Sequence, residues 1–450
     1  MKKSILIAVM VVTANFSCRN NGTEAPSSDF QIIAEDVGVT EVWLRVKFTQ
    51  SSEPLTLIIT RDGHEFHTSQ YSLLDTIILS DFLLPKHTYE YTATLTGRKN
   101  LLTSFTRLTV TTMDTTSHDF KWEIDTLGEG AGSVLNDVVI VNDTCVWAVG
   151  EISVKDSMGN FVTPPYNYAM WNGSHWILRT SFEQGYLYGA LSTVWAFSPN
   201  DVWVGSTIPE HWDGTRWTFY GTARGFPTSF YITKIWGTSS SDLYVVGTSG
   251  SIVHFDGTRW SEMESGTDVN LTDIWGTPDG KELWACGFRE QDGASTIIRR
   301  RADNPSTWQR LWDSRISMPP YLYQGFMSTL WSAGRSEFLI TSGILFRHSF
   351  LNPSILRVER VVTANGWHLF NFKNFPYRLR GTASNNVIAV GDDARIWHFN
   401  GQNWYSYEEL LNSNDRLYGL FVSERMMVGV GTRYGAGPFR SALVITGKRR

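Results

Sequence analysis

The sequence predicts an all-β protein built largely from one repeated unit, and two observations support this fold class. First, the 450 residues include 38 glycines and 14% aromatic residues, among them 19 tryptophans, a composition typical of many short strands joined by tight turns. Second, residues 232–260 contain three strand-like apolar runs and the start of a fourth, separated by turn residues at hairpin spacing. Much of the downstream chain is a looser copy of this stretch.

The copies can be aligned on a glycine that ends the second apolar run of each unit, and the mean period is about 47 residues. A four-stranded unit with this period is typical of a β-propeller, because one unit cannot bury both faces of its sheet without neighbours. The sequence therefore predicts a seven-bladed β-propeller, with six or eight blades as alternatives. The aligned glycines are Gly150, Gly205, Gly247, Gly287, Gly343, Gly391 and Gly431, and the preceding strands end at Val139, Trp195, Trp236, Trp275, Trp331, Arg380 and Leu420.

A second recurring element is an Asp-Gly or Asn-Gly dipeptide with a tryptophan three residues beyond the glycine. It occurs at Asn172-Gly173, Asp213-Gly214, Asp256-Gly257 and Asn400-Gly401. This dipeptide favours a primed hairpin turn, in which both central residues have positive φ. The element resembles the Asp-box hairpin of sialidase-type propellers. Residues 120–450 more closely resemble the Ile-Trp-Gly, Asp-Val-Tyr-x-Val-Gly and Asp-Gly-x-x-Trp repeats of bacterial exported propellers of undefined role, which implies a fold but no activity.

We assign residues 114–450 to the propeller and expect its ring to be closed by a strand from before the first copy. The last copy stops after the third apolar run, Ala442 to Ile445, with no Asp-Gly turn following it. Residues 118–124 look like an orphan fourth strand. A strand at 120–126 that pairs with the C-terminal three would leave no unpaired strand edges.

Residues 30–113 are expected to form a separate domain with strand patterns of alternating character. Val42, Leu44, Val46 and Phe48 recur at period two, and residues 61–64 mark a tight turn. The segment from Leu83 to Tyr91 resembles the passage from strand E to strand F of fibronectin type III domains, with Tyr89 in the place of the tyrosine corner. The resemblance implies a β-sandwich that serves as a spacer or a protein-contact module.

The N-terminus reads as an export signal followed by a tether. Residues 1–17 combine two lysines with an apolar run too short to cross a bilayer, which indicates a signal peptide. Cys18 resembles the lipidated cysteine of bacterial lipoproteins, and polar residues 18–29 would form a flexible tether. We therefore expect a lipid-anchored protein of the bacterial envelope, at the outer membrane or surface, with a periplasmic or secreted protein as the alternative.

Charge and cysteine usage exclude several classes of partner and cofactor. The chain has 39 Lys and Arg against 44 Asp and Glu, so its formal net charge of −5 provides no basic surface for nucleic acid. Cys145 and Cys286 lie in apolar runs and are expected to be buried hydrophobes rather than a disulfide. No Cys and His cluster has metal-ligand spacing, so no metal or cofactor is expected.

Binding is expected on the connections between second and third strands and between successive repeats, which share one face of a propeller. Here these connections are the long ones, and long loops on a rigid scaffold commonly bind ligands. Their aromatic and charged side chains suit a protein or a glycan, although each residue alone could merely cover the end of a blade. The candidate ligand-binding residues are Tyr166, Tyr186, Tyr188, Arg224, Phe226, Arg289, Asp292, Arg315, Tyr321 and Tyr323.

No catalytic residue is predicted. Sialidases need three converging arginines, whereas Arg299, Arg300 and Arg301 are contiguous, so neighbouring side chains would point to opposite faces of a strand. A glycosidase pair among Glu183, Glu290 and Asp292 stays open, because spacing does not reveal such pairs in loops. The sequence favours an envelope binding or scaffold protein, with a carbohydrate-active enzyme or an envelope assembly factor as alternatives.

Overall fold

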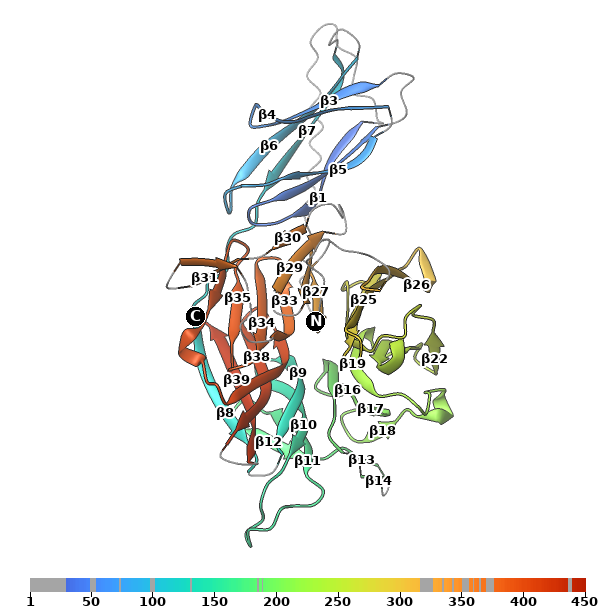
Figure 1. The fold of residues 1–450 in the computed structure, drawn as a ribbon, viewed down its shortest axis with the longest axis vertical. Helices are drawn as coiled ribbons and strands as arrows, with labels where there is room; N and C mark the ends of the chain where they lie inside the picture. Colours follow the sequence, from blue (N-terminus) through green and yellow to red (C-terminus); the bar gives the residue numbers. More distant parts are fainter. Residues whose placement is uncertain are drawn as a thin grey trace, which may run out of the picture. The chain divides into compact units, whose positions relative to one another are not determined.

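The computed structural model describes residues 30–48, 54–72, 74–97, 102–129, 132–183, 186–187, 189–315, 327–333, 336–341, 344–349, 356–358, 360–363, 366–369, 376–435 and 439–450 (Figure 1). The chain folds into two compact units. One contains Leu44–Ile78, Tyr89–Val110 and residues up to Ala34; the other contains Thr111–Arg450 with the short segments Glu35–Trp43 and Leu79–Thr88. The predicted signal peptide, the predicted tether and Cys18 all lie outside the described residues.

The N-terminal strands form two sheets. The three-stranded sheet has the order β1 (Gln31–Val37), β2 (Val42–Phe48), β5 (Leu74–Ser80), and the four-stranded sheet has the order β4 (His64–Tyr71), β3 (Leu55–Arg61), β6 (Thr88–Thr96), β7 (Leu102–Thr111). Asp62 and Gly63 join β3 to β4 with φ values of 50° and 81°, the left-handed pair that a tight hairpin turn requires. Tyr89 on β6 is buried, at 7% exposure.

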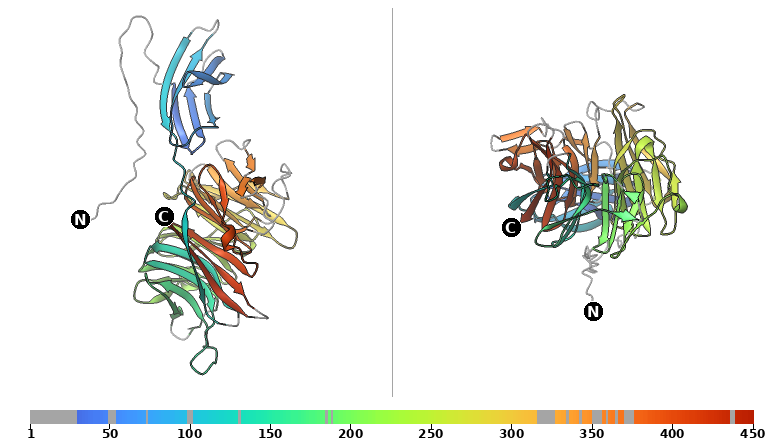
Figure 2. Two further views of the ribbon diagram at one scale, coloured as in Figure 1. Left: turned by 90° about the vertical axis from the view of Figure 1, so that its left-hand side faces the viewer. Right: turned by 90° about the horizontal axis from the view of Figure 1, so that it is seen from below.

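From Phe120 onward, the described residues form seven sheets of at least four strands each, which we number sheets 1 to 7 along the chain (Figures 1 and 2). Neighbouring strands within each repeat pair antiparallel, in sequence order. The strands are, in sheet 1, β9 (Val134–Asn142), β10 (Cys145–Ile152), β11 (Tyr166–Trp171) and β12 (Trp176–Arg179); in sheet 2, β15 (Thr193–Ser198), β16 (Asp201–Gly205), β17 (Pro209–Trp212) and β18 (Trp217–Phe219); in sheet 3, β19 (Ile232–Ser239), β20 (Asp242–Gly247), β21 (Ile252–Phe255) and β22 (Trp260–Met263); in sheet 4, β23 (Leu271–Gly276), β24 (Glu282–Arg289), β25 (Ala294–Arg301) and β26 (Asn304–Asp313); in sheet 5, β27 (Thr329–Ser332), β28 (Ser336–Thr341), β29 (Ile344–Ser349) and β30 (Leu356–Val358); in sheet 6, β33 (Pro376–Ala383), β34 (Asn386–Gly391), β35 (Ile396–Phe399) and β36 (Trp404–Ser406), extended by β31 (Arg360–Thr363) and β32 (Gly366–Leu369); and in sheet 7, β37 (Asp415–Val422), β38 (Met426–Tyr434), β39 (Arg440–Arg449) and β8 (Phe120–Leu127).

Sheet 7 combines the two ends of this unit. Strand β8 pairs antiparallel with β39 from Phe120 opposite Arg449 to Leu127 opposite Ala442, and Figure 1 shows the two strands side by side. A short two-stranded ladder, β13 (Phe182–Glu183) with β14 (Tyr186–Leu187), lies between sheets 1 and 2 in the sequence. The first strands of the sheets contact one another in a closed cycle: β9, β15, β19, β23, β27, β33, β37 and again β9.

A bulge near the start of the first strand joins neighbouring sheets. In β19, for example, Ile232 pairs with Gly247 and Lys234 with Val246, so Thr233 is the extra residue. Thr233 donates its hydroxyl proton to the carbonyl of Leu271 in the next sheet, at 2.5 Å. The same link recurs as Asn136 to Leu191 (2.7 Å), Ser192 to Ile232 (2.6 Å), Thr272 to Met327 (3.1 Å) and Ser328 to Pro376 (3.0 Å). These bonds satisfy carbonyls that adjacent sheets would otherwise leave unpaired.

The register corrects the alignment of the last repeat. In β37 the bulge falls between Leu417 and Gly419, and Phe421 pairs with Val428. Phe421, not Leu420, therefore stands where the other repeats have Trp195 or Trp236, and its ring lies 6.1 Å from that of Trp195. An inserted bulge residue shifts side-chain alternation by one, which apolar spacing alone did not reveal.

The Asp-Gly turns also differ from the predicted primed type. Phe255 pairs with Trp260, which leaves a four-residue loop, and only Gly257 has positive φ, at 93°. The Asp256 side chain stabilises this loop instead: its Oδ1 accepts hydrogen bonds from the backbone N–H groups of Thr258 (2.8 Å) and Arg259 (2.9 Å). These bonds, with that from the Thr258 hydroxyl as the largest cause, lower the pKa of Asp256 to about 2.

Candidate functional site

The first strands carry a ring of polar side chains, one residue beyond each bulge, which we call the inner ring. In sheets 1 to 6 the residue at this position is charged or a threonine, and most of these side chains are almost fully buried. Its members are Asp137, Thr193, Lys234, Asp273, Thr329, Arg378 and, in sheet 7, Gly419, by their matching registers. A Cβ at Gly419 would lie 2.7 Å from the Cα of Asp137, so close approach requires glycine there.

Sheets 1 to 3 contribute the first half of the ring. Oδ2 of Asp137 accepts from the Thr193 hydroxyl (2.9 Å), from the Val194 backbone N–H (3.0 Å) and from the ammonium of Lys234. The Lys234 and Asp137 side chains are only 3% and 1% exposed. The Asp137 carboxylate of sheet 1 thus accepts hydrogen bonds from sheet 2 and from the Lys234 cation of sheet 3. These contacts fix the first strands of the three sheets relative to one another.

Sheets 4 to 6 repeat this arrangement. Asp273 accepts from the Thr329 hydroxyl at 2.6 Å and binds the Arg380 guanidinium through two bonds, of 2.7 and 2.9 Å. A second guanidinium, that of Arg378, places Nη1 3.1 Å from Asp273 Oδ1. Bidentate arginine pairing is the strong form of a buried ion pair. The second half therefore has two cations for one carboxylate.

Burial and charge set the ionisation of this cluster. Burial lowers the pKa of Lys234 to about 8; Asp137 opposes that shift, while the charges of Arg380 and Arg378 add to it. Burial alone would raise the pKa of Asp273, but the two arginines outweigh it and hold that pKa well below its usual range. Because the charges of Arg378 and Arg380 help to lower the pKa of Lys234, the cations of both halves share one electrostatic environment.

Aromatic side chains form a second layer two residues further along the first strands. The Trp195 ring lies 5.8 Å from Trp275 and 6.3 Å from Trp236. Arg380 holds its guanidinium carbon 4.9 Å from the centre of the Trp275 ring. The sequence alignment includes these aromatic positions, and the inner ring lies two residues before them on each strand. Charged residues recur at that earlier position within apolar runs, and this recurrence was the sequence signal that could have revealed the inner ring.

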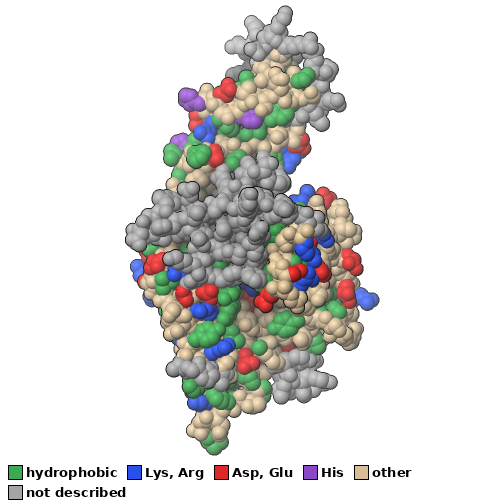
Figure 3. Space-filling view, viewed as in Figure 1, with side chains coloured by type: hydrophobic (Ala, Val, Ile, Leu, Met, Phe, Trp, Pro, Cys, Tyr) green, Lys and Arg blue, Asp and Glu red, His purple; other side chains and the backbone are tan. Residues whose placement is uncertain are grey.

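Three of the predicted binding residues come together at one end of sheet 4. Asp268 bridges Arg289 and Arg315, with a distance of 2.8 Å to each guanidinium. Arg289 also binds Asp292, and Arg315 forms a bidentate pair with Asp313. Figure 3 shows acidic and basic side chains interspersed in this part of the surface it draws, over β25 and β26. Every one of these charges already has an opposite partner.

The remaining predicted residues have separate surroundings. Phe226 is 2% exposed and packs against Phe230 and Trp260, so it is a core residue and no longer a candidate for ligand binding. Arg224 is exposed and stacks on Tyr220 at 4.2 Å. Tyr166 is half-buried against the core of sheet 1. The side chain of Tyr186 and all of Tyr188, Tyr321 and Tyr323 lie outside what the structure describes.

Exposed apolar side chains gather on the expected connections. We call the edge that carries second-to-third-strand and sheet-to-sheet connections the loop edge. Of the exposed large apolar side chains described after Thr111, four lie on its connections: Met158 (81% exposed), Phe161 (41%), Tyr231 (46%) and Phe439 (54%). Two others, Ile124 and Tyr405, lie on outer strands. None of these four was among the predicted binding residues, because side-chain exposure is not visible in the sequence.

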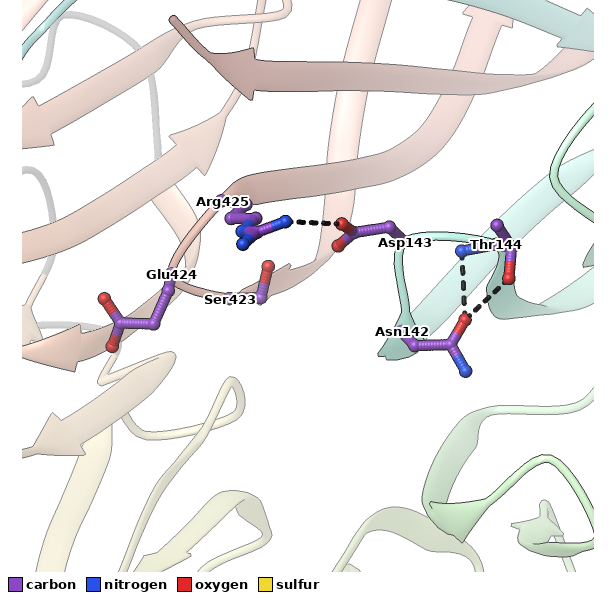
Figure 4. Close-up of a pocket in the computed structure, with 6 residues that line it drawn as sticks. All are labelled: Asn142, Asp143, Thr144, Ser423, Glu424 and Arg425. Atoms are coloured by element: carbon purple, nitrogen blue, oxygen red, sulfur yellow. Dashed lines mark hydrogen bonds and ion pairs between the residues drawn. The ribbon is translucent and has the colours of Figure 1, made fainter. Parts of the chain in front are cut away.

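The opposite edge holds a shallow depression between two turns (Figure 4). Asn142, Asp143 and Thr144 line one side and Ser423, Glu424 and Arg425 the other, with a volume of about 490 Å³. Arg425 and Asp143 lie 3.7 Å apart, with side chains 83% and 59% exposed. An ion pair this exposed contributes little, and the depression has no buried polar group to orient a ligand.

Three histidines before the Asp-Gly turns bond within their own sheets. In each case Nε2 lies within hydrogen-bond distance of a side-chain oxygen on the first residue of the second strand. The pairs are His211 with Asp201 (2.9 Å), His254 with Asp242 (2.9 Å) and His398 with Asn386 (3.2 Å). The rings of His211 and His254 also stack on Trp203 and Tyr244, both at 4.4 Å. These contacts indicate a packing role rather than general-base catalysis.

The described residues contain no group of three metal-ligating side chains, and Cys145 and Cys286 are both free. No helix in the described part of the chain is long and apolar enough to span a membrane.

Comparison with solved structures identifies the fold. YCF48 bound to D1 peptide matches with a TM-score of 0.52 and 14% identity, over 73% of this chain and 95% of that one. The WD40 β-propeller domain of Doa1 matches with a TM-score of 0.50 and 10% identity, over 72% of this chain and 96% of that one. The protein has a β-propeller fold. The predicted all-β class and propeller architecture are thereby confirmed.

Sequence comparison is less extensive. No protein-family model matches the chain. The immune protein Tsi7 of Pseudomonas aeruginosa is 39% identical over 133 residues, which are 29% of this chain. The match spans 40% of the length of that relative.

Proposed function

We propose that this protein is a binding scaffold whose loop edge contacts a partner protein. The observation that carries the proposal is the position of Met158, Phe161, Tyr231 and Phe439, whose exposed apolar surface projects from loops on a rigid propeller. Exposed apolar side chains that lie close together mark protein-interaction sites, and Met158 and Phe161 share one connection, between β10 and β11. YCF48 is a propeller bound to a peptide, and Tsi7 is named an immune protein, which is consistent with a protein ligand.

The proposal includes a finer architecture. Seven sheets linked in one cycle, the seventh completed by β8, support a seven-bladed ring closed by its N-terminal strand. The sheet orders β1-β2-β5 and β4-β3-β6-β7 match those of a fibronectin type III sandwich and support the spacer role. In this proposal Cys18 carries the lipid that holds the protein at the bacterial envelope.

Catalysis is not part of the proposal. A glycosidase needs one carboxylic acid whose pKa is raised, whereas hydrogen bonds from Arg289 hold the pKa of Asp292 well below its usual range. Asp292 is therefore a poor general acid. The side chain of Glu183 lies outside the described residues, and Glu290 is exposed beside Asp292 in the same loop.

The binding proposal is tested by photo-cross-linking in cells that express the full chain. A photoreactive amino acid replaces Met158 or Tyr231 on the loop edge and, as matched controls, Asp143 or Arg425 on the opposite edge. We expect the same protein partner to cross-link from both loop-edge positions and from neither control. A Phe161→Asp substitution should weaken the Met158 cross-link. Equal labelling at both edges would refute the loop edge as the interface, and labelling of polysaccharide alone would favour the glycan alternative.

The anchor is tested separately. Cys18→Ser should move the protein from the membrane fraction to the soluble fraction, because one thiol is the attachment point of the lipid. Thermal melting should be the same for both forms. Equal partitioning of the two forms between the membrane and soluble fractions would refute the lipid anchor, whereas the binding proposal would stand.

A further inference from the structure

The inner ring and the aromatic layer carry more positive than negative charge. In the described residues, Lys234, Arg378 and Arg380 supply three cations, and Asp137 and Asp273 supply two carboxylates. Asp137 pairs in charge with Lys234, although its Oδ1 has no donor among the described residues, and Asp273 pairs with Arg380. The excess charge therefore resides at Arg378, whose side chain is 12% exposed.

The hydrogen bonding of Arg378 is incomplete as well. Its Nε and Nη1 are buried and have no hydrogen-bond acceptor among the described residues. Nη1 lies 3.1 Å from Asp273 Oδ1, which is an ion-pair distance, but the two groups do not form a hydrogen bond. Buried donors and unpaired buried charge both disfavour the folded state. A water molecule could supply an acceptor but not the missing negative charge.

We propose that the inner ring binds one small monovalent anion, of halide size, at the guanidinium of Arg378. The anion would accept from the free Nε–H of Arg378 and neutralise the excess charge of the ring. The low exposure of Arg378 favours an ion over a peptide side chain. The site is independent of the loop-edge proposal, since it uses none of the loop residues.

Lys234 provides an independent electrostatic link. Its pKa is lowered in part by the positive charges of Arg378 and Arg380, so an anion that screens them should raise that pKa. Anion binding is then coupled to proton uptake by Lys234. The anion should stabilise the protein most below about pH 8, where Lys234 is charged, and less above it.

The test measures the stability of the full chain in chloride and in gluconate, an anion much larger than a halide, at equal ionic strength. Binding to the folded state alone should lower the unfolding equilibrium constant about tenfold at a chloride concentration about ten times the dissociation constant. Bromide and nitrate should act like chloride. Equal melting in chloride and gluconate would overturn the proposal.

Variants separate the site from general salt effects. Arg378→Gln should abolish the difference between chloride and gluconate, while Arg378→Lys should retain part of it. Arg425→Gln, at an exposed arginine, should leave it unchanged. If Arg378→Gln does not fold, crystals of the unmodified protein in bromide decide: an anomalous peak within bonding distance of Arg378 supports the site, and no peak there refutes it. A chloride effect that persists in Arg378→Gln would also refute it.

Discussion

Replacement of Asp273 by asparagine removes one charge from the centre of the ring without changing its shape. The Asp273 side chain is fully buried and binds Arg380 through both oxygens, with Arg378 and the Thr329 hydroxyl close by. Asparagine would turn an NH₂ group toward one of these donors and leave both guanidinium groups without the carboxylate that pairs with them. We expect Asp273→Asn to be among the most destabilising conservative changes in the chain.

The magnitude follows from burial. Removing one partner of a buried ion pair costs about 3 to 5 kcal/mol, because the other charge is left uncompensated. Asp279→Asn is the matched control, since Asp279 pairs with Lys281 at the surface, with side chains 52% and 73% exposed. An exposed pair contributes about 0 to 1 kcal/mol. The two Asp→Asn changes should therefore differ by several-fold in cost.

Urea unfolding at pH 7 measures both free energies, and an acid series supplies a second readout. The pKa of Asp273 is depressed in the folded state, so its stabilisation is present above the unfolded pKa of about 4 and is lost as the pH falls toward the folded value. The gap between the parent and Asp273→Asn should narrow below about pH 4. A loss at pH 7 no larger than that of Asp279→Asn would refute the account of the ring.

Two further predictions concern a turn and the ring closure. Gly257→Val should destabilise by about 1 to 3 kcal/mol from backbone strain, and by more than Gly293→Val, because a Cβ at Gly257 lies 2.8 Å from the Ser241 Cβ whereas one at Gly293 meets nothing within 4 Å; equal melting temperatures would contradict this. A chain that begins at Gly132 lacks β8 and exposes the edge of β39, so it should aggregate, while one that begins at Ser117 should stay soluble and melt cooperatively; equal solubility of the two would argue against closure through β8.

Local patterns in the sequence were sufficient for the repeat and its fold. The spacing of strand-ending glycines and the recurring Asp-Gly turns depend on residues within one hairpin, so they predicted a propeller that the structure confirms. The predictions were wrong in detail at two places, the strand register of the last repeat and the type of the Asp-Gly turns. The bulge at Tyr418 displaced the last aligned position from Leu420 to Phe421, and the carboxylate of Asp256 replaced a second left-handed turn residue.

The inner ring depended on the tertiary structure. Asp137 and Lys234 are 97 residues apart, and Asp273 and Arg380 are 107 apart. Each lies in a largely apolar strand, and local spacing does not indicate which charges will meet. The packing of the sheets in a cycle brings the cation of sheet 3 within reach of Asp137 in sheet 1, and those of sheet 6 within reach of Asp273 in sheet 4. The sequence by itself determined the strands, the turns and their period because those are local, whereas the pairing of buried charges, and the excess left at Arg378, arose only when the cycle brought distant strands together.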